Sequence, residues 1–260
     1  MGNKRQNFLL TVLVAIFLAG LGVLLYTAAH GALTQWRMKG KAEEFLSFVQ
    51  TEAYVPPATA PSDCAKPESE EVKLPERFPQ LWLDMQAYNK ALYESGQTGL
   101  SNPSAYEEPS FNLADYGVPE EVFGVISIPK LDVELPLYLG ATGQHMADGA
   151  AHMTQTSLPI GGDNTNCVIA GHRGWKGAAY FLYLPQLEQG DIVQVTNLWE
   201  TLTYKVVETK IIYPDEVEAI HIQPGKELLT RLTCHPPASG GKQRYLVFCE
   251  RVQTEMEVNH

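Results

Sequence analysis

The longest uninterrupted hydrophobic stretch of the chain lies near its N-terminus. Residues 8–26, FLLTVLVAIFLAGLGVLLY, carry no charge. An α-helix rises 1.5 Å per residue, so this run would cover roughly 28 Å, close to the hydrocarbon thickness of a bilayer. A cleaved signal peptide is the alternative, but its hydrophobic region usually has about 7–15 residues, fewer than this run. We therefore expect an uncleaved transmembrane anchor.

Two later segments show the spacing of amphipathic helices. Residues 41–50, KAEEFLSFVQ, predict a short helix that Gly40 separates from the anchor. In residues 81–95 apolar side chains recur every three to four positions, and Gly96 follows as a plausible C-terminal stop. The residues that carry this second pattern are Leu81, Met85, Tyr88 and Leu92.

From residue 122 onward the pattern changes to short runs rich in β-branched and aromatic residues, which favour strands. Many short strands within about 130 residues predict a mainly β fold, a closed or nearly closed barrel. Only residues 176–187, KGAAYFLYLPQL, look helical in this region. The seven predicted strands lie in VFGVISIPKL, VELPLYLG, NCVIAG, DIVQVTNL, TLTYKVVETKIIY, ELLTRLTC and RYLVFCERV.

These patterns divide the chain into five parts. Residues 51–80 and 97–121 are irregular and rich in Pro, Ser and acidic residues, so we interpret them as connecting segments. Two basic residues in a short N-terminus favour an orientation with the N-terminus inside and the large acidic part outside. The parts are a cytoplasmic tail (1–7), the anchor (8–26), an extracellular extension (27–121), the barrel (122–253) and a C-terminal tail (254–260).

Net charge and cysteine usage narrow the classes of function. The chain has 260 residues and a formal net charge of -11, which argues against a nucleic-acid partner because phosphate binding needs a basic surface. Of the four cysteines, Cys167 and Cys249 lie inside apolar strand-like runs, and we predict that both are buried thiols. Cys64 lies in a Pro-rich stretch and receives no role.

The fourth cysteine, Cys234, ends a predicted strand and is followed by His235 and two prolines. His172 also follows a predicted strand, and Arg244 opens the strand after Cys234. Strand ends of a barrel line a common rim, where a histidine can move protons and a fixed cation can lower a thiol pKa or stabilise an oxyanion. Taken singly, each residue also fits a purely structural role. Cys234 could be a buried thiol, His172 a capping residue and Arg244 a solvated charge.

Three motifs resemble those of the sortase family and occur in the same order, over about residues 122–252. TRLTC resembles the sortase signature T-L-x-T-C, GHRG resembles the segment of the catalytic histidine, and Arg244 falls where sortases place an essential arginine. The run GAAHMTQTSLPIGGDNTNCVIAGHRG extends the resemblance. Arg231 departs from it by replacing the leucine of the signature, on the strand face opposite Cys234, so we expect packing to change more than chemistry.

The resemblance implies an eight-stranded sortase-type barrel and a cysteine transpeptidase with Cys234 as nucleophile, His172 as acid and base, and Arg244 as oxyanion donor. It makes His152 and Thr233 candidates for the substrate groove, together with His235, which is also a candidate tuner of the thiolate. The implied substrate is a surface or pilin protein with an LPxTG-like sorting signal. The implied acceptor is an amine, from a pilin lysine or a peptidoglycan cross-bridge, and this chemistry needs no cofactor or metal.

AGHRGW and the long extension resemble the pilin-polymerising class C sortases, which carry a lid built around an Asp-Pro-aromatic motif. Here the corresponding stretch reads SNPSAY and EEPSF, so Pro103, Glu108 and Phe111 are the candidate lid residues. A plain linker over residues 101–111 is the alternative. For function, a housekeeping enzyme that anchors surface proteins to peptidoglycan is the alternative to pilus assembly.

Three other functions stay open from the residues themselves. Water in place of the amine would give a hydrolytic cysteine peptidase with the same residues. A membrane-tethered binding ectodomain without chemistry would fit if Cys234 were a buried or disulfide-bonded thiol. A zinc site is the weakest, because the chain has no C-x-x-C or H-x-x-x-H spacing and adjacent Cys234 and His235 cannot easily close one tetrahedron.

Overall fold

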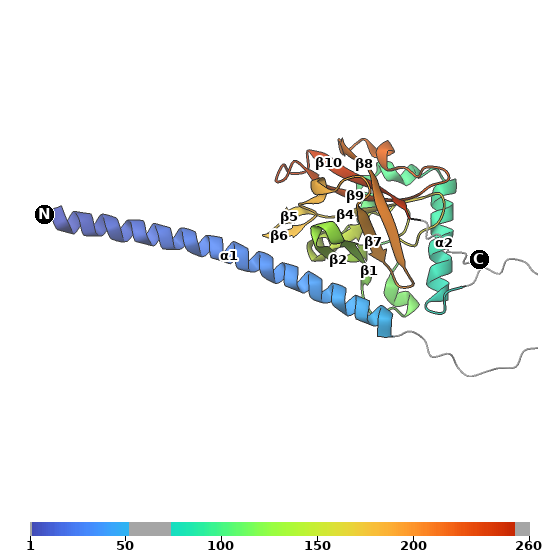
Figure 1. Ribbon diagram of the computed structural model, residues 1–260, viewed down its shortest axis with the longest axis horizontal. Helices are drawn as coiled ribbons and strands as arrows, with labels where there is room; N and C mark the ends of the chain where they lie inside the picture. Colours follow the sequence, from blue (N-terminus) through green and yellow to red (C-terminus); the bar gives the residue numbers. More distant parts are fainter. Residues whose placement is uncertain (1, 52–73, 253–260) are drawn as a thin grey trace, which may run out of the picture.

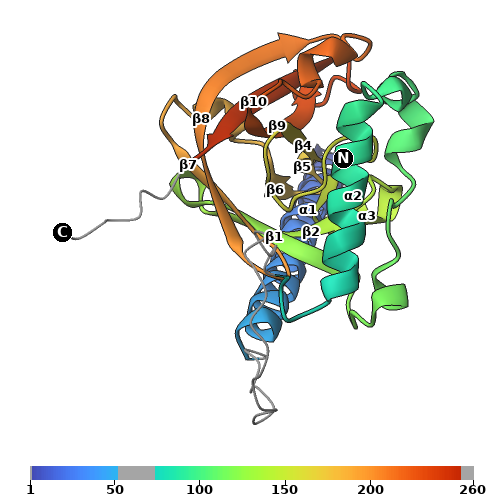
Figure 2. The same cartoon turned by 90° about the vertical axis from the view of Figure 1, so that its right-hand side faces the viewer.

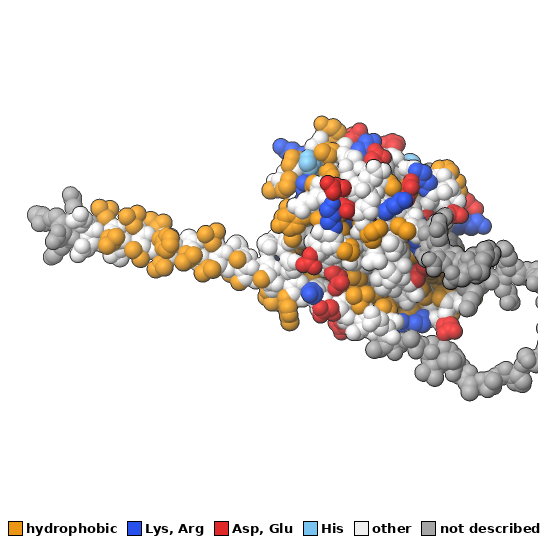
Figure 3. Space-filling model, in the orientation of Figure 1, with side chains coloured by type: hydrophobic (Ala, Val, Ile, Leu, Met, Phe, Trp, Pro, Cys, Tyr) orange, Lys and Arg blue, Asp and Glu red, His pale blue; other side chains and the backbone are white. Residues whose placement is uncertain are grey.

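The computed structural model describes residues 2–51 and 74–252 of the chain (Figure 1). Most of the predicted linker over residues 51–80, Cys64 and the C-terminal tail lie outside the described residues. The apolar run over residues 8–26 lies within α1, Gly2–Thr51, and that half of the helix extends away from the barrel with its hydrophobic side chains exposed (Figures 1 and 3). It is long and apolar enough to cross a membrane.

The expected break at Gly40 is wrong, since α1 is continuous through this residue. A glycine inside a helix costs about 1 kcal/mol relative to alanine. That cost is offset because Met38, Ala42 and Phe45, on one face of the same helix, are all buried. The amphipathic pattern of residues 41–50 therefore belongs to the last turns of α1, which lie on the barrel.

Eight strands form a closed barrel in the order β1-β2-β3-β4-β9-β10-β8-β7 (Figure 2). All seven predicted strand runs are present, and the predicted mainly β barrel is confirmed. The eighth strand, β3, has three residues and was too short for a pattern to reveal. The strands are β1 (Val122–Ile128), β2 (Val133–Leu139), β3 (Ala150–His152), β4 (Thr165–Ala170), β7 (Ile192–Thr196), β8 (Thr201–Ile212), β9 (Glu227–His235) and β10 (Gln243–Arg251).

The predicted helix over residues 176–187 is also wrong. The segment begins with β6 (Ala178–Tyr180), which pairs with β5 (Arg173–Trp175) in a separate two-stranded hairpin, and ends in the 3-10 turn η5 (Leu184–Gln186). Gly177, at φ +87°, makes the hairpin turn in a conformation that side chains rarely adopt. The apolar residues that suggested a helix, Phe181 and Leu184 among them, are instead buried in the core cluster of the barrel.

The parallel pairing of β4 with β9 places the two candidate catalytic segments at one rim. The pairing runs from Thr165 opposite Glu227 to Ala170 opposite Leu232. Because the strands are parallel, both C-terminal ends point the same way. His172 lies two residues beyond the end of β4, and Cys234 lies two residues beyond the end of the paired register on β9. β10 pairs antiparallel with β9 and places Arg244 directly opposite Cys234.

Two helices cover one side of the barrel. α2 (Pro79–Glu94) confirms the predicted helix over residues 81–95, and it buries Leu81, Met85 and Leu92. Gly96, at φ +66°, follows the end of α2 as the sequence indicates. Leu81 and Met85 pack in one hydrophobic cluster with Ala42 and Phe45 of α1 and with barrel residues such as Phe123 and Val125. The extension is therefore part of the folded domain.

Along β9, alternate residues face the interior of the barrel or its outer surface. Leu229 belongs to the interior cluster, which also contains Cys167 and Cys249, so both predicted buried thiols are confirmed. Arg231 points the same way and is fully buried. Its Nη2 lies 3.7 Å from the Cys249 sulfur, while Nε and Nη1 have no hydrogen-bond partner among the described residues. Burial lowers the pKa of this guanidinium.

The buried guanidinium of Arg231 predicts a stabilising substitution. Arg231→Leu restores the residue of the family signature and removes two unpartnered buried donors, so we expect the free energy of unfolding to rise by about 1–4 kcal/mol. Arg231→Lys keeps a buried charge and serves as the matched control, with no such gain. Chemical denaturation of the two variants beside the wild type measures the difference. A less stable Arg231→Leu protein would mean that the guanidinium is well solvated or paired.

Candidate active site

A pocket of about 340 Å³ lies at the rim where β4 and β9 end. His172, Cys234 and Arg244 all line it, so the fold brings together the three residues that the sequence places far apart. Apolar side chains, including Met153, Ile212 and Leu232, complete much of its wall. An apolar pocket with a few convergent polar groups is typical of a substrate site.

The two residues on neighbouring strands, Cys234 and Arg244, approach the pocket from β9 and β10. Cys234 is a free thiol and is partly exposed, as a nucleophile must be. The Arg244 guanidinium donates from Nη1 to the carbonyl oxygens of Gly241 and Gln243, at 2.5 and 3.2 Å. These backbone bonds hold the cation in the β9–β10 loop, beside the pocket that also contains the thiol.

Aromatic rings hold the imidazole of His172, and a backbone hydrogen bond holds its main chain. It stacks on Trp175 with ring centroids 4.6 Å apart, and the Tyr180 ring meets it edge-on at 5.5 Å. The carbonyl of His172 accepts a hydrogen bond from the Phe181 amide at 2.9 Å. Burial lowers the pKa of His172, because the low-dielectric surroundings disfavour the imidazolium. The ring thus has a defined orientation and releases its proton readily.

Thr233 joins the strand ends that carry the histidine and the cysteine. Its hydroxyl donates to the Gly171 carbonyl at 2.8 Å, and the Gly171 amide donates to the Leu232 carbonyl at 3.0 Å. Thr233 lines the pocket but is only 1% exposed. A Cβ on Gly171 would lie 2.5 Å from the Phe181 ring, so glycine is required there. Thr233 is therefore placed to fix the rim more than to contact a substrate.

His235 lies beside the pocket and points toward Arg173. The Arg173 Nη1 lies 2.6 Å from His235 Nδ1 and 3.3 Å from the Cys234 carbonyl oxygen. A guanidinium can only donate, so His235 Nδ1 is the acceptor in this contact. His235 is not among the residues that line the pocket. Arg173 is a neighbour of Cys234 that sequence reasoning missed, although it lies inside the GHRG motif.

The expectation that His152 lines the substrate groove is wrong. His152 is on β3 and is fully buried, and its Nε2 lies 3.2 Å from both the carbonyl and the hydroxyl oxygen of Thr156. Burial lowers the pKa of His152 to about 4, so the imidazole is neutral at ordinary pH. The sequence pattern did not reveal β3, and the buried position of this histidine went unrecognised with it.

Residues 101–111 reach the pocket, but not through the side chains that the sequence indicated. Tyr106 and Glu107 line it. Glu108 is exposed and does not, and Phe111 packs against Tyr88 and Tyr116 at centroid distances of 6.0 and 6.1 Å. The candidate Pro103 begins the 3-10 turn η2 (Pro103–Tyr106) that carries Tyr106 to the rim.

Backbone contacts fasten this segment to the barrel. The Ala141 amide donates to the Tyr106 carbonyl at 2.9 Å, and the Thr154 hydroxyl donates to the Glu108 carbonyl at 2.5 Å. A Cβ on Gly140, which has φ +81°, would lie 2.8 Å from the Pro109 nitrogen. A segment held this closely is a wall of the pocket, which disfavours a plain linker.

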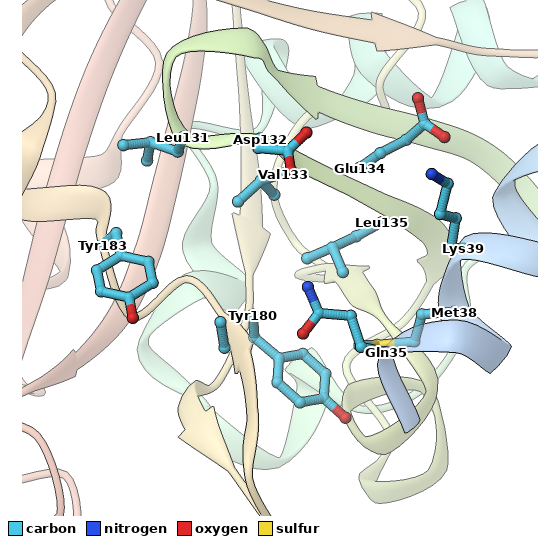
Figure 4. Close-up of a pocket in the computed structure, with 11 residues that line it drawn as sticks. Gln35, Met38, Lys39, Leu131, Asp132, Val133, Glu134, Leu135, Tyr180 and Tyr183 are labelled. Carbon is cyan, nitrogen blue, oxygen red and sulfur yellow. The ribbon is translucent and has the colours of Figure 1, made fainter. Parts of the chain in front are cut away.

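Among residues 2–51 and 74–252, no group of three or more His, Cys, Asp or Glu side chains is arranged to hold a metal ion. A second pocket of about 350 Å³ lies between α1, β2 and β6, and it is lined by residues such as Gln35, Leu135 and Tyr180 (Figure 4). Neither cysteine nor histidine lines it. The groups suited to acyl transfer are therefore those of the rim pocket.

Comparisons with known proteins show which family the chain resembles. The Sortase domain family model matches residues 126–252. Sortase D of Bacillus subtilis is 30% identical over 163 residues, which cover 61% of this chain and 76% of that protein. A pilus-related sortase C of Group B Streptococcus is 31% identical with a TM-score of 0.54, covering 66% of this chain and 91% of that one. Streptococcus pneumoniae sortase C is 27% identical with a TM-score of 0.61, covering 83% and 97%.

The buried His152 predicts a pH-dependent stability. A histidine in the unfolded chain binds a proton below about pH 6.5, whereas folded His152 does so only below about 4. Between these values the unfolded state holds more protons, so the free energy of unfolding falls as pH falls, by up to about 1.4 kcal/mol per pH unit. His152→Gln should remove this part of the acid sensitivity. Urea unfolding at pH 7 and pH 5 measures it, and equal losses in wild type and variant would contradict the assignment.

Proposed function

The chain belongs to the sortase family of cysteine transpeptidases, and from that premise we propose that it cleaves an LPxTG-like sorting signal and polymerises pilins. The observation that carries the proposal is the rim pocket, which contains Cys234, His172 and Arg244 and is walled by Tyr106 and Glu107 of the extension. The three rim residues supply the chemistry. The wall restricts which polypeptides reach it.

In the first half of the reaction the Cys234 thiolate attacks the carbonyl carbon of the scissile peptide bond in the sorting signal. A tetrahedral oxyanion forms and collapses to a thioester as the C–N bond breaks. The leaving amine needs a proton, which His172 as imidazolium donates. The lowered pKa of His172 makes the imidazolium a stronger acid, which favours this transfer.

In the second half an incoming amine attacks the thioester carbonyl. His172, now neutral, accepts the proton that the amine loses, and the C–S bond breaks to return the Cys234 thiolate. Arg244 faces both oxyanions from the neighbouring strand and stabilises their charge by donating hydrogen bonds. The donors of Arg244 that are not bonded to the Gly241 and Gln243 carbonyls are the ones available for this role.

Residues 101–111, which form one side of the pocket, favour pilin polymerisation over the anchoring of proteins to peptidoglycan. In the resemblance to class C sortases this segment corresponds to the lid, and two solved sortase C structures are among the similar proteins. Tyr106 and Glu107 line the pocket in a stretch that lacks the Asp-Pro-aromatic motif. The preferred acceptor is then a lysine amine on a second pilin. Anchoring to a peptidoglycan amine is the second candidate, because sortase A proteins are also similar to the chain.

The proposal includes a single membrane crossing by α1, with the barrel on the extracytoplasmic side. The apolar half of α1 supplies a span, and Lys4 and Arg5 precede it. Sorting-signal proteins reach their sortase outside the cytoplasm, so this orientation places the rim pocket where the substrates and the acceptor amines are. The membrane is thus the support on which both enzyme and substrate are held.

The identity of the acceptor amine is the direct test of this function. The full chain in detergent or nanodiscs is incubated with an LPxTG-type pilin and two competing amines, a pilin domain with an accessible lysine and a peptidoglycan cross-bridge peptide. Mass spectrometry of the products should show pilin–pilin isopeptide bonds in excess. Exclusive transfer to the cross-bridge amine would assign the anchoring function, and release of free acid alone would assign a hydrolase.

The same assay tests the three roles in the pocket. Cys234→Ala and His172→Ala should each lower transfer and cleavage by at least about a thousandfold, because the nucleophile and the proton donor have no substitutes in the pocket. Arg244→Lys should cost about 10²–10³, since lysine keeps the charge but loses the fork of donors. Cys249→Ala, a buried thiol on β10, is the matched control. If Cys234→Ala cleaved the sorting signal at the wild-type rate, Cys234 would not be the nucleophile.

The wall also predicts how fast small reagents reach Cys234. Removing the side chains of Tyr106 and Glu107 together opens the pocket, so the double alanine variant should be alkylated by iodoacetamide severalfold faster than the wild type. Phe111→Ala alters the same segment away from the pocket and is the control, with a smaller change. Equal alkylation rates in wild type and double variant, both folded by circular dichroism, would reduce residues 101–111 to a linker.

A further inference from the structure

The hairpin of β5 and β6 touches α1 just beyond the apolar run. We call Trp175, Lys176 and Gly177 the hairpin tip. A Cβ on Gly31 of α1 would lie 2.4 Å from the backbone of Gly177, and a Cβ on Gly177 would lie 2.7 Å from the Thr27 carbonyl oxygen. Figure 1 shows the hairpin at the end of the barrel that faces the apolar half of α1. This contact between two glycines holds the tip against the helix.

The position of this contact fixes the depth of the hairpin tip relative to a bilayer. Thr27 directly follows the apolar run over residues 8–26, and Gly31 lies five residues past its end, about 7.5 Å along the helix. The polar headgroup layer on each side of the hydrocarbon is of similar thickness, about 5–8 Å. With the apolar run in the hydrocarbon, the hairpin tip lies at the level of the headgroups.

The chemistry of the tip suits that level. Trp175 is 42% exposed, Lys176 is exposed, and the Lys176 ammonium lies 5.5 Å from the centre of the Trp175 ring. Tryptophan favours the membrane interface because its ring is amphipathic, and lysine extends its ammonium to anionic phosphates there. The surface that the tip presents is therefore one that a lipid headgroup layer complements.

A cavity of about 530 Å³ between the tip and α1 adds further cations. Arg37, Lys41 and Lys176 line it, against two carboxylates, Glu44 and Asp148. Lys41 pairs with Asp148 at 3.0 Å. The lining of this cavity therefore carries a net positive charge in a protein whose total is -11. His30 also lines it, and its buried Nδ1 has no hydrogen-bond partner among the described residues.

We propose that the hairpin tip and this cavity bind the anionic phospholipid headgroups of the leaflet from which α1 emerges. The bilayer surface is then a second partner of the catalytic domain, in addition to the span itself. Trp175 stacks directly on His172, so headgroup contact sets the catalytic rim at a fixed height and angle above the membrane. A sorting signal that is still tethered to the bilayer meets the rim at that height. The inference rests on the proposed membrane anchor.

A depth measurement on the full chain tests this contact without using catalysis. Lys176→Cys, in a Cys64→Ser and Cys234→Ala background, is labelled with bimane and placed in phosphatidylglycerol nanodiscs. Lipid carrying a nitroxide on its headgroup should quench this label at least about twofold. The matched control is Lys90→Cys on α2, a helix that contacts the barrel away from the tip. A bimane label at this position should show no quenching. Equal quenching at the two sites would overturn the proposal while leaving the enzyme assignment untouched.

Charge reversal then tests whether the contact matters for the reaction. Lys176→Glu and Arg37→Glu should each slow transfer from a bilayer-tethered sorting signal by about fivefold in phosphatidylglycerol nanodiscs. Neither should slow transfer from a soluble signal peptide, and Lys90→Glu should change neither rate. Equal slowing with both substrates would show that the two cations act inside the catalytic site, which would overturn the proposal.

Discussion

The parallel pairing of β4 with β9 is the constraint on which the candidate active site depends. Residues 172 and 234 are far apart in the chain, and no local interaction brings them together. The pairing places both strand ends at one rim, and the Thr233 hydroxyl joins the end of β9 to Gly171 at 2.8 Å. β10 then adds Arg244 by its register opposite Cys234. β9, β10 and the loop after β4 thus each supply one of the three candidate residues, Cys234, Arg244 and His172, to a pocket of about 340 Å³.

The parts outside the barrel act through that rim. The wall of Tyr106 and Glu107 is fastened by backbone bonds to barrel loops, so it closes one side of the pocket without any motif of its own. The rim also adjoins the β5–β6 hairpin, in which Trp175 stacks on His172. Because the same hairpin meets α1 at Gly31, the His172 imidazole is connected through Trp175 to the helix that carries the apolar run.

The sequence was sufficient where residues repeat with the period of their element or match a motif. The seven longer strands, α2 and the grouping of Cys234, His172 and Arg244 at strand ends were predicted in this way. It failed where tertiary packing overrode local preference: Gly40 does not end α1, and residues 176–187 turn at Gly177 instead of forming a helix. The burial of His152 and the contact of Arg173 with His235 depend on neighbours remote in sequence, so no local pattern reveals them.

We propose that the Thr233 link between the two strand ends positions the His172 imidazole for the Cys234 thiol. Steady-state kinetics of Thr233→Val and Thr233→Ser with a sorting-signal peptide test it most directly, because valine keeps the shape of threonine and removes only the hydroxyl, whereas serine keeps the hydroxyl. Misplacement of catalytic groups by a fraction of an ångström to about 1 Å costs roughly tenfold to a hundredfold. We expect kcat to fall by that factor in Thr233→Val, with KM little changed, and to be largely retained in Thr233→Ser. A Thr233→Val enzyme with wild-type kcat would show that this link does not position the imidazole.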